Sequence, residues 1–278
     1  PRDGARPLQS AHGGYDGITP DQLEIRRQEI QSGLSTQDAY NDLYAQTDLA
    51  QLDSFYLWLL DLLQPSPGRT LLDISCGQGR LAELAAQRDV RVVGTDFSFA
   101  GLLYGKSRIP AARWVASDGE KLPFADHSFD YVTHIGSLEH YEHPRDGARE
   151  IARMLAPAGR ACVLLPNAYG FFGNVLYVAR HGEIFDDGQP LQRYGTLGTW
   201  RALLMHAGLT VEQIVPYGEV SRPRTARDWA WLAVRPHKIV RAAVQRTLPI
   251  AWANHFVFLC RLSSAAAGEA AYPTLVRL

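Results

Sequence analysis

Residues 70–79 read Thr-Leu-Leu-Asp-Ile-Ser-Cys-Gly-Gln-Gly, and a helix-forming stretch follows from Arg80. The apolar run predicts a buried strand, and the small residues after it predict a tight turn. A Gly-rich turn lets the backbone approach a ligand closely, and a helix start offers free N–H groups. Asp73 adds a carboxylate at the strand end, which would repel a pyrophosphate but suits a ligand carrying an ammonium group. This stretch therefore predicts a site for a zwitterionic cofactor.

Around this stretch, short apolar strands alternate with amphipathic helices from Arg69 onward. Such alternation is typical of a parallel sheet with crossover helices, so we predict an α/β, doubly wound fold with helices on both faces. The strands are expected at 70–74, 91–95, 112–116, 129–135, 160–165, 209–216 and 255–261. The helices are expected at 21–32, 48–63, 79–88, 98–106, 144–155 and 197–206.

The composition is that of an ordinary globular protein, with 46% hydrophobic and 21% charged residues among 278. A formal net charge of −1 argues against a general nucleic-acid binder. Cys76, Cys162 and Cys260 are widely spaced and odd in number, which indicates buried thiols in a reducing compartment. No apolar run reaches transmembrane length and no signal peptide opens the chain. We therefore expect a cytoplasmic protein without a bound metal.

Three parts are expected along the chain. Residues 1–64 form an arm and helices that close over the cofactor site, 65–262 form the core, and 263–278 form a tail. Within the core, 167–195 and 218–253 interrupt the alternation and exceed the usual length of a connection. Because long connections after sheet strands usually carry the site, we expect both to cap it.

One interpretation of the glycine turn is a nicotinamide site. Residues 77–82, Gly-Gln-Gly-Arg-Leu-Ala, match the dinucleotide fingerprint, and Asp96 follows Gly77 at the distance of a ribose-binding acid. Three features favour another ligand. They are the carboxylate of Asp73, a second acidic position at Asp118, and the block 122–130 (Leu-Pro-Phe-Ala-Asp-His-Ser-Phe-Asp) before the fourth strand.

With these residues in place, the chain resembles the class I S-adenosylmethionine-dependent methyltransferases, in particular the subgroup acting on small molecules, quinones and lipids. The matching stretches are Leu71–Leu81, Val92–Ser98, Ala116–Asp130 and Tyr131–Pro144. The resemblance implies a Rossmann-like, seven-stranded sheet whose last strand is antiparallel and inserted beside the fifth. It also implies S-adenosylmethionine as the cofactor, with S-adenosylhomocysteine as the product.

The resemblance implies roles for individual residues. The methionine end of the cofactor would be lined by Asp73, Ser75, Gly77 and Gly79. Ser75 is a departure, since the family usually has Gly at that position. Asp96 would take both ribose hydroxyls in a pair of hydrogen bonds. Taken alone, an acid at Asp96 is also typical of a helix N-terminus.

The adenine and sulfonium ends follow in the same way. The residues implied are Phe97 and Ser98 beside the adenosine, Asp118 and Gly119 at the adenine ring, and Ile135, Gly136 and Ser137 facing the sulfonium. Asp-Gly alone is also typical of a turn, but the combination of three acids at matching spacings favours the cofactor site. Tyr40 and Tyr44 are expected to close over the cofactor, as N-terminal helices do in similar enzymes.

The segment 137–144, Ser-Leu-Glu-His-Tyr-Glu-His-Pro, follows the fourth strand at the edge where ligands bind. Methyl transfer from a sulfonium needs the nucleophile held in line, and needs a base only for a hydroxyl or protonated amine. We predict His140 as the base or orienting residue, with Glu139, Tyr141 and His143 as further candidates. Capping or packing at the next helix is the alternative for His140.

Two segments are candidates for contact with the acceptor. Residues 167–174 mix aromatics with glycines, and Tyr169, Phe171 and Phe172 are predicted to contact it; ordinary packing of a lid helix is the alternative. Residues 222–246 contain seven basic residues and one acid, Asp228, interleaved with apolar ones. They predict recognition of an anionic acceptor or contact with an acidic membrane surface, against the alternative of a solvated helical face.

The favoured hypothesis is methyl transfer to an oxygen or nitrogen of a small-molecule, lipid-like or glycan-like acceptor. An NAD(P)-dependent oxidoreductase shares the glycine pattern but leaves Asp73 unexplained. A catalytically silent cofactor-binding partner subunit is the third hypothesis, because methyl transfer requires no obligatory base. A nucleic-acid acceptor is not expected, since 136–139 read Gly-Ser-Leu-Glu rather than an Asn/Asp-Pro-Pro-aromatic motif. The sequence leaves the oligomeric state open.

Overall fold

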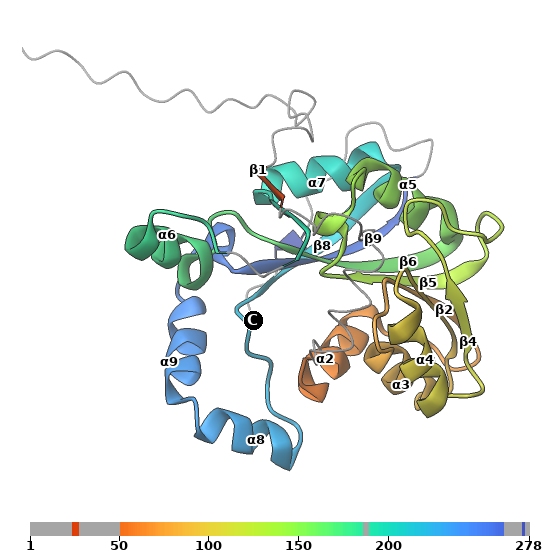
Figure 1. Cartoon of the computed structure of the whole chain (residues 1–278), viewed down its shortest axis with the longest axis horizontal. Helices are drawn as coiled ribbons and strands as arrows, with labels where there is room; N and C mark the ends of the chain where they lie inside the picture. Colours follow the sequence, from red (N-terminus) through yellow and green to blue (C-terminus); the bar gives the residue numbers. More distant parts are fainter. Residues whose placement is uncertain (1–23, 28–50, 186–188, 264–273, 276–278) are drawn as a thin grey trace, which may run out of the picture.

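The computed structural model describes residues 24–27, 51–185, 189–263 and 274–275. A central twisted sheet carries helices on both faces, and one arm of helices projects away from it (Figure 1). The order of strands in the sheet is β10-β8-β9-β6-β5-β2-β3-β4. The bounds are β2 (Thr70–Ile74), β3 (Arg91–Asp96), β4 (Arg113–Ala116), β5 (Phe129–Ile135), β6 (Leu155–Pro166), β8 (Leu209–Tyr217), β9 (His255–Leu262) and β10 (Thr274–Leu275).

The predicted fold class is confirmed. All seven expected strands are present, and β9 lies antiparallel between β6 and β8, while the ladders from β6 to β4 are parallel. The two-residue strand β10 adds a parallel edge beside β8, within the part of the chain that was expected to be a tail. Because parallel strands end at a common edge, β2, β3 and β5 bring their following loops together.

Two apolar layers hold the helices against the sheet. Successive residues of β2 point to opposite faces, so Leu72 packs in the layer under α5 and α7, while Leu71 packs in the layer under α2 and α3. The helices are α2 (Asp53–Leu63), α3 (Arg80–Ala86), α4 (Phe99–Arg108), α5 (Pro144–Met154) and α7 (Leu197–His206). Each predicted crossover helix is therefore present, with ends shifted by up to two residues.

The N-terminal prediction was wrong at the residues that the structure describes there. Residues Glu24–Arg27 form the strand β1, not a helix, and pair antiparallel with β7 (Leu191–Tyr194). Their composition favours a helix, but pairing with a strand more than 160 residues away overrides local propensity. The second predicted helix is present as α2; its first three residues lie outside the described part of the chain.

The two long connections fold into short elements. The first contains a π-helical turn η3 (Phe171–Val175), α6 (Leu176–His181) and β7. The second contains α8 (Ala226–Ala233), α9 (Pro236–Gln245) and the 3-10 turn η4 (Ile250–Trp252). Figure 1 shows α6, α9 and α8 as the projecting arm, at the opposite end of the molecule from α3, α4 and β4. None of the helices in the described ranges is long and apolar enough to cross a membrane.

The turn after β2 is held by a tight contact with an aromatic ring. Gly79 has φ +75°, and a Cβ there would lie 2.3 Å from the ring of Trp114. Gly68 has φ +76° with no heavy atom within 4 Å of a Cβ. The two glycines therefore share a left-handed backbone and differ only in the space around them.

We expect Gly79→Ala to lower the free energy of unfolding by about 3 kcal/mol or more, and Gly68→Ala by about 1 kcal/mol. Both substitutions strain the backbone, but only the first forces Trp114 to move. Urea unfolding of the two variants without added ligand measures the difference. Equal destabilisation would show that the Trp114 contact does not constrain the turn.

Candidate functional site

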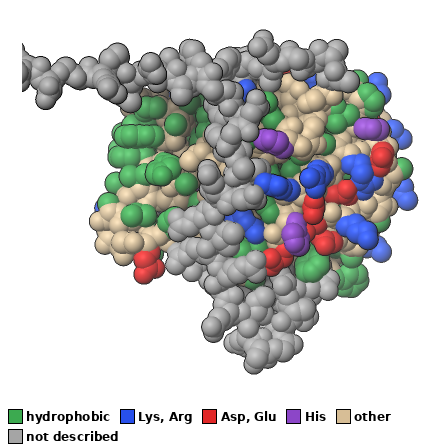
Figure 2. Space-filling view, turned by 90° about the horizontal axis from the view of Figure 1, so that it is seen from above, with side chains coloured by type: hydrophobic (Ala, Val, Ile, Leu, Met, Phe, Trp, Pro, Cys, Tyr) green, Lys and Arg blue, Asp and Glu red, His purple; other side chains and the backbone are tan. Residues whose placement is uncertain are grey.

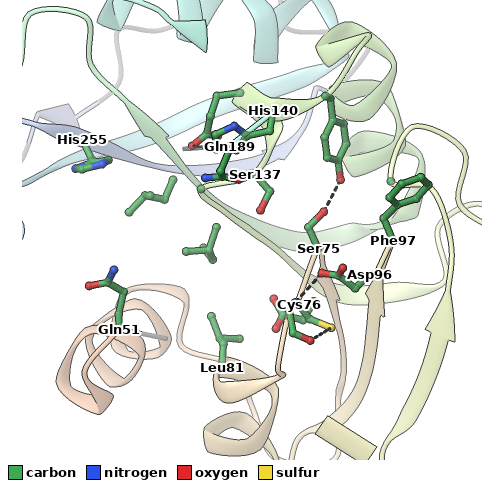
Figure 3. A pocket seen from close by; sticks show the side chains of 18 of the residues that line it. Gln51, Ser75, Cys76, Leu81, Asp96, Phe97, Ser137, His140, Gln189 and His255 are labelled. Carbon is green, nitrogen blue, oxygen red and sulfur yellow. Dashed lines mark hydrogen bonds and ion pairs between the residues drawn. The ribbon is translucent and has the colours of Figure 1, made fainter. Parts of the chain in front are cut away.

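A cavity of about 900 Å³ opens at the carboxyl edge of β2, β3 and β5. Its walls come from the loops after these strands, from α2 and from the long connection that contains α8 and α9. In Figure 3, Asp96 and Phe97 lie on one side of the cavity and His255 on the other, with His140 and Ser137 on the wall between them. The volume is at the upper end of the about 300–1,000 Å³ typical of small-molecule sites, which leaves room for two ligands.

Asp96 joins the two turns that frame the cofactor end of the cavity. One carboxylate oxygen accepts a hydrogen bond from the Gly77 N–H at 2.7 Å, and the other accepts from the Ser98 N–H at 2.7 Å. The side chain is 5% exposed, and burial raises the pKa of its carboxyl while these N–H groups oppose the shift. The turns after β2 and β3 are thus both hydrogen-bonded to one carboxylate.

Asp73 is the most deeply buried carboxylate in the cavity wall, at 3% exposure. Burial raises the pKa of its carboxyl to about 7, the Thr133 hydroxyl donates to it at 2.7 Å and opposes the shift, and the charge of Asp96 raises it further. A buried carboxylate of this kind is stabilised in its ionised form by a positive ligand. The local charge therefore suits a cation rather than a phosphate.

The remaining cofactor candidates divide into two groups. Those that line the cavity with Asp73 and Asp96 are Ser75, Gly77, Phe97, Asp118, Gly119, Ile135, Gly136 and Ser137. Gly79 and Ser98 do not line it. Gly79 packs on Trp114, and Ser98 is the N-cap of α4, where its hydroxyl accepts from the Gly101 N–H. Their contribution to the site is to shape the two turns.

His140 lies in a 3-10 turn, η2 (Leu138–His140), directly after β5 and in the cavity wall. Its Nδ1 is hydrogen-bonded to the carbonyl oxygen of Leu191, and a carbonyl can only accept. Nδ1 therefore carries the proton, and Nε2, 3.7 Å from a carboxylate oxygen of Glu139, is the basic nitrogen of the neutral ring. This geometry suits a residue that takes up a proton.

Tyr141 follows the same turn, and its side chain is held by hydrogen bonds to other parts of the structure. Its hydroxyl lies 2.7 Å from the Ser75 hydroxyl and 3.0 Å from His134 Nε2. Burial raises the pKa of the Tyr141 phenol above its usual range and lowers the pKa of His134 to about 3. Gly119 packs on the Tyr141 ring so closely that a Cβ would overlap the hydroxyl. Tyr141 thus positions the turn that begins at Ser75.

His143 is an exposed residue at the cavity rim, with its side chain 71% accessible. Its Nδ1 lies 2.8 Å from a Glu120 carboxylate oxygen, and this hydrogen bond raises the pKa of the imidazole. The Glu120 carboxylate also accepts from the His143 N–H at 2.8 Å. The pair closes the rim between the loops after β4 and β5.

The three aromatic residues that were predicted to contact the acceptor do not lie in one cavity. Tyr169 is 61% exposed, and Phe171 stacks on Trp252 with ring centroids 5.5 Å apart. Neither lines the main cavity or the adjoining one of about 430 Å³. Phe172 does line the adjoining cavity, under the guanidinium of Arg241. Tyr40 and Tyr44 lie outside the described residues.

The structure adds a polar cluster that the sequence did not single out. Glu219 forms an ion pair with Lys238 at 2.6 Å and accepts from the Asn254 side chain at 2.9 Å. Lys238 keeps the pKa of Glu219 below its usual range although burial opposes this, and burial lowers the pKa of the neighbouring His255. Glu219 and His255 line both cavities. In the sequence, the only signal for this cluster was the basic segment 222–246, which contains Lys238.

Comparison with known proteins matches residues 72–163 to the family described as a methyltransferase domain. Over these residues the chain is similar to class I S-adenosylmethionine-dependent methyltransferase domains. A demethylmenaquinone methyltransferase from Renibacterium salmoninarum is 33% identical over 126 residues, which are 45% of this chain and 52% of that protein. The chain thus spans about half the length of that relative.

A ubiquinone/menaquinone biosynthesis C-methyltransferase from Roseobacter denitrificans is 29% identical over 177 residues, 57% of this chain and 68% of that protein. Among solved structures, an S-adenosylmethionine-dependent methyltransferase from Mesorhizobium loti has a TM-score of 0.56 at 16% identity, covering 75% of this chain and 97% of that one. A [4+2]-cyclase, SpnF, has the same TM-score at 19% identity, covering 77% and 82%. These structures support the fold alone.

S-adenosylmethionine is the cofactor of this class of domain. The cavity fits it, because its buried carboxylates would favour a cationic ligand, and the exposed Phe97 ring would offer a surface for the adenine base. The match to a methyltransferase family gives no support to the oxidoreductase alternative.

The raised pKa of Asp73 predicts a pH-dependent stability. The folded chain holds this proton up to about pH 7, whereas the unfolded chain loses it near pH 3.8. The stability that the proton provides is full below the lower value and is lost as pH rises through the upper one. Between about pH 4 and pH 8, the free energy of unfolding of the unmodified chain should therefore fall by up to about 4 kcal/mol relative to that of the Asp73→Asn variant.

Unfolding by urea at several pH values measures this difference. Asp130→Asn is the matched control, because hydrogen bonds from Thr70 lower the pKa of Asp130 although burial opposes them. Its effect should have the opposite sign, with stability lost as pH falls. If the difference in the free energy of unfolding between the unmodified chain and Asp73→Asn does not change with pH, the pKa of Asp73 is not raised.

Proposed function

We propose that this protein transfers a methyl group from S-adenosylmethionine to a small, lipophilic acceptor of the hydroquinone type. The observation that carries the proposal is the convergence of Asp73, Asp96 and Asp118, each at or just beyond the carboxyl end of a different strand, on one cavity beside His140. The names of the quinone methyltransferase relatives support the class of acceptor.

In this proposal the acids hold the three parts of the cofactor. Asp73 binds the ammonium group, since it is the most deeply buried carboxylate in the cavity wall. Asp96 binds the ribose hydroxyls through lone pairs that remain beside its two backbone bonds. Asp118 and Phe97 hold the adenine at the rim. The cofactor supplies a methyl group on a positively charged sulfur, which leaves as a neutral thioether.

His140 is the proposed general base. Removal of the proton from a phenolic hydroxyl makes both the oxygen and the adjacent ring carbon nucleophilic. The same base therefore serves methylation of oxygen, as the sequence suggested, and of carbon, as the name of one relative states for that protein. Which atom reacts depends on the orientation in which the acceptor is held.

The [4+2]-cyclase SpnF has a similar fold, so the fold alone is not specific for methyl transfer. A catalytically silent partner subunit would bind the cofactor without methylating any acceptor. Incubation with labelled S-adenosylmethionine and a short-chain demethylmenaquinol distinguishes the two, since only an active enzyme gives a labelled product.

Asp96→Ala tests the cofactor site. We expect it to weaken S-adenosylhomocysteine binding about 10- to 100-fold, because it removes charged hydrogen bonds to the ribose. Asp130→Ala is the control, since that carboxylate also accepts a backbone N–H but does not line either cavity. Titration calorimetry measures both. Unchanged affinity in Asp96→Ala would remove the basis of the assignment.

His140→Gln tests the base. We expect kcat to fall about 10²- to 10⁴-fold with little change in S-adenosylhomocysteine affinity. The defect should shrink as pH approaches the pKa of the acceptor hydroxyl, about 10 for a phenol, because the acceptor then ionises without help. His143→Gln should leave kcat within about threefold, because that ring is exposed at the rim and paired with Glu120. Equal effects of the two variants, or a pH-independent defect, would contradict a base role.

A further inference from the structure

Helix α9 has its polar and apolar faces reversed relative to an ordinary surface helix. None of its ten residues is buried. The half-buried positions are the polar residues Lys238, Arg241 and Gln245, spaced three and four residues apart on one side, and the small residue Ala242 beside them. The exposed positions include Ile239 and Val240, at 50% and 62% accessibility. A helix that covers a core in water has the opposite arrangement.

Helix α8 continues the exposed apolar surface. Asp228 and Leu232 point inward and are buried, whereas Trp229 is 61% exposed. Val234, at the C-terminal end of α8, is 74% exposed. We call the exposed apolar side chains of both helices the α8–α9 surface: Trp229, Val234, Ile239, Val240 and Val244.

The inner side of the same helices faces the cavities. Lys238 and Trp231 line the larger cavity, and Arg241 lines the adjoining one. Lys238 is held there by its ion pair with Glu219. Lys238 and Arg241 therefore point inward, which leaves the apolar side chains outward and exposed to solvent. An apolar surface of this kind marks a binding site for a membrane or another protein.

Charge selects between these partners. From residue 220 to residue 262 the chain contains one acid, Asp228, which is buried, and its exposed bases include Arg222, Arg227 and Arg246. Exposed tryptophan and valine together with arginine and without exposed acids are typical of a segment that lies in the interface of an anionic bilayer. Figure 2 shows hydrophobic side chains gathered at the end of the molecule where Figure 1 places α6, away from the charged end.

We propose that the α8–α9 surface docks on a bilayer that contains anionic phospholipids. Its apolar side chains enter the headgroup region and its arginines contact phosphates. The cavity then opens beside the membrane, and a lipophilic acceptor reaches it without crossing water. Docking itself does not depend on the proposed methyl transfer, so each can fail without the other.

Vesicle co-sedimentation of the full chain tests the proposal. The vesicles are phosphatidylcholine alone or with about one third phosphatidylglycerol, at low and high salt. We expect binding to the anionic vesicles only, weakened by salt. Ile239→Ser/Val240→Ser should reduce it about tenfold or more, and Arg222→Glu/Arg246→Glu should reduce it similarly.

Matched controls lie at the other end of the molecule. Leu103→Ser on α4 removes a side chain of similar exposure (52%), and Arg113→Glu/Arg145→Glu makes the same charge change. Both should bind like the unmodified chain. S-adenosylhomocysteine affinity and melting temperature confirm that each variant is folded.

Three outcomes would overturn the proposal. One is no binding to anionic vesicles. Another is binding that the controls reduce as much as the α8–α9 variants do. The last is a dimer in light scattering that Ile239→Ser/Val240→Ser dissociates, because a second copy of the chain would then cover the surface.

Discussion

The carboxylate of Asp96 is the constraint on which the site depends. It accepts one backbone N–H from the turn after β2 and one from the turn after β3, so a single side chain fixes the distance between two loops. Charge-assisted hydrogen bonds of this kind are worth about 1.5–3 kcal/mol each. The helix α4 closes on the same turn, where a Cβ on Gly101 would lie 2.9 Å from the Gly77 carbonyl oxygen. The cofactor end of the cavity is therefore shaped before any ligand binds.

Ser75 shows how a departure from the usual glycine is accommodated. Its backbone has φ 53°, the left-handed region, which costs a residue with a side chain about 1–2 kcal/mol. The Cβ atom causes this cost, but it also carries the hydroxyl that lies at hydrogen-bond distance from the Tyr141 hydroxyl, and such a bond contributes about 1 kcal/mol. The two effects are of similar size. Tyr141, a catalytic candidate in the sequence, thus also holds the turn after β2 in place.

The core of the fold could be predicted because its signals are local. The strands alternate with helices, and the turn after β2 carries its glycines and acid within ten residues. The β1 strand could not be predicted, since its partner β7 is distant in sequence and its own composition favours a helix. The Glu219–Lys238–His255 cluster was missed for the same reason, as its members meet only when α9 and β9 are in place. Local spacing therefore identifies residues that meet at one end of the cavity, and tertiary packing decides which residues line the other end.

The cavity has two chemically different ends, and this difference bears on the choice of methylated atom. Buried carboxylates with raised pKa values dominate the cofactor end, where they favour a cation. The other end carries the Glu219–Lys238 ion pair and His255, which can donate to and accept from a polar acceptor group. An acceptor anchored there presents a different atom to His140 and the sulfonium according to its length. A base alone does not select between oxygen and carbon, so in the proposed function the distance between the two ends decides which atom is methylated.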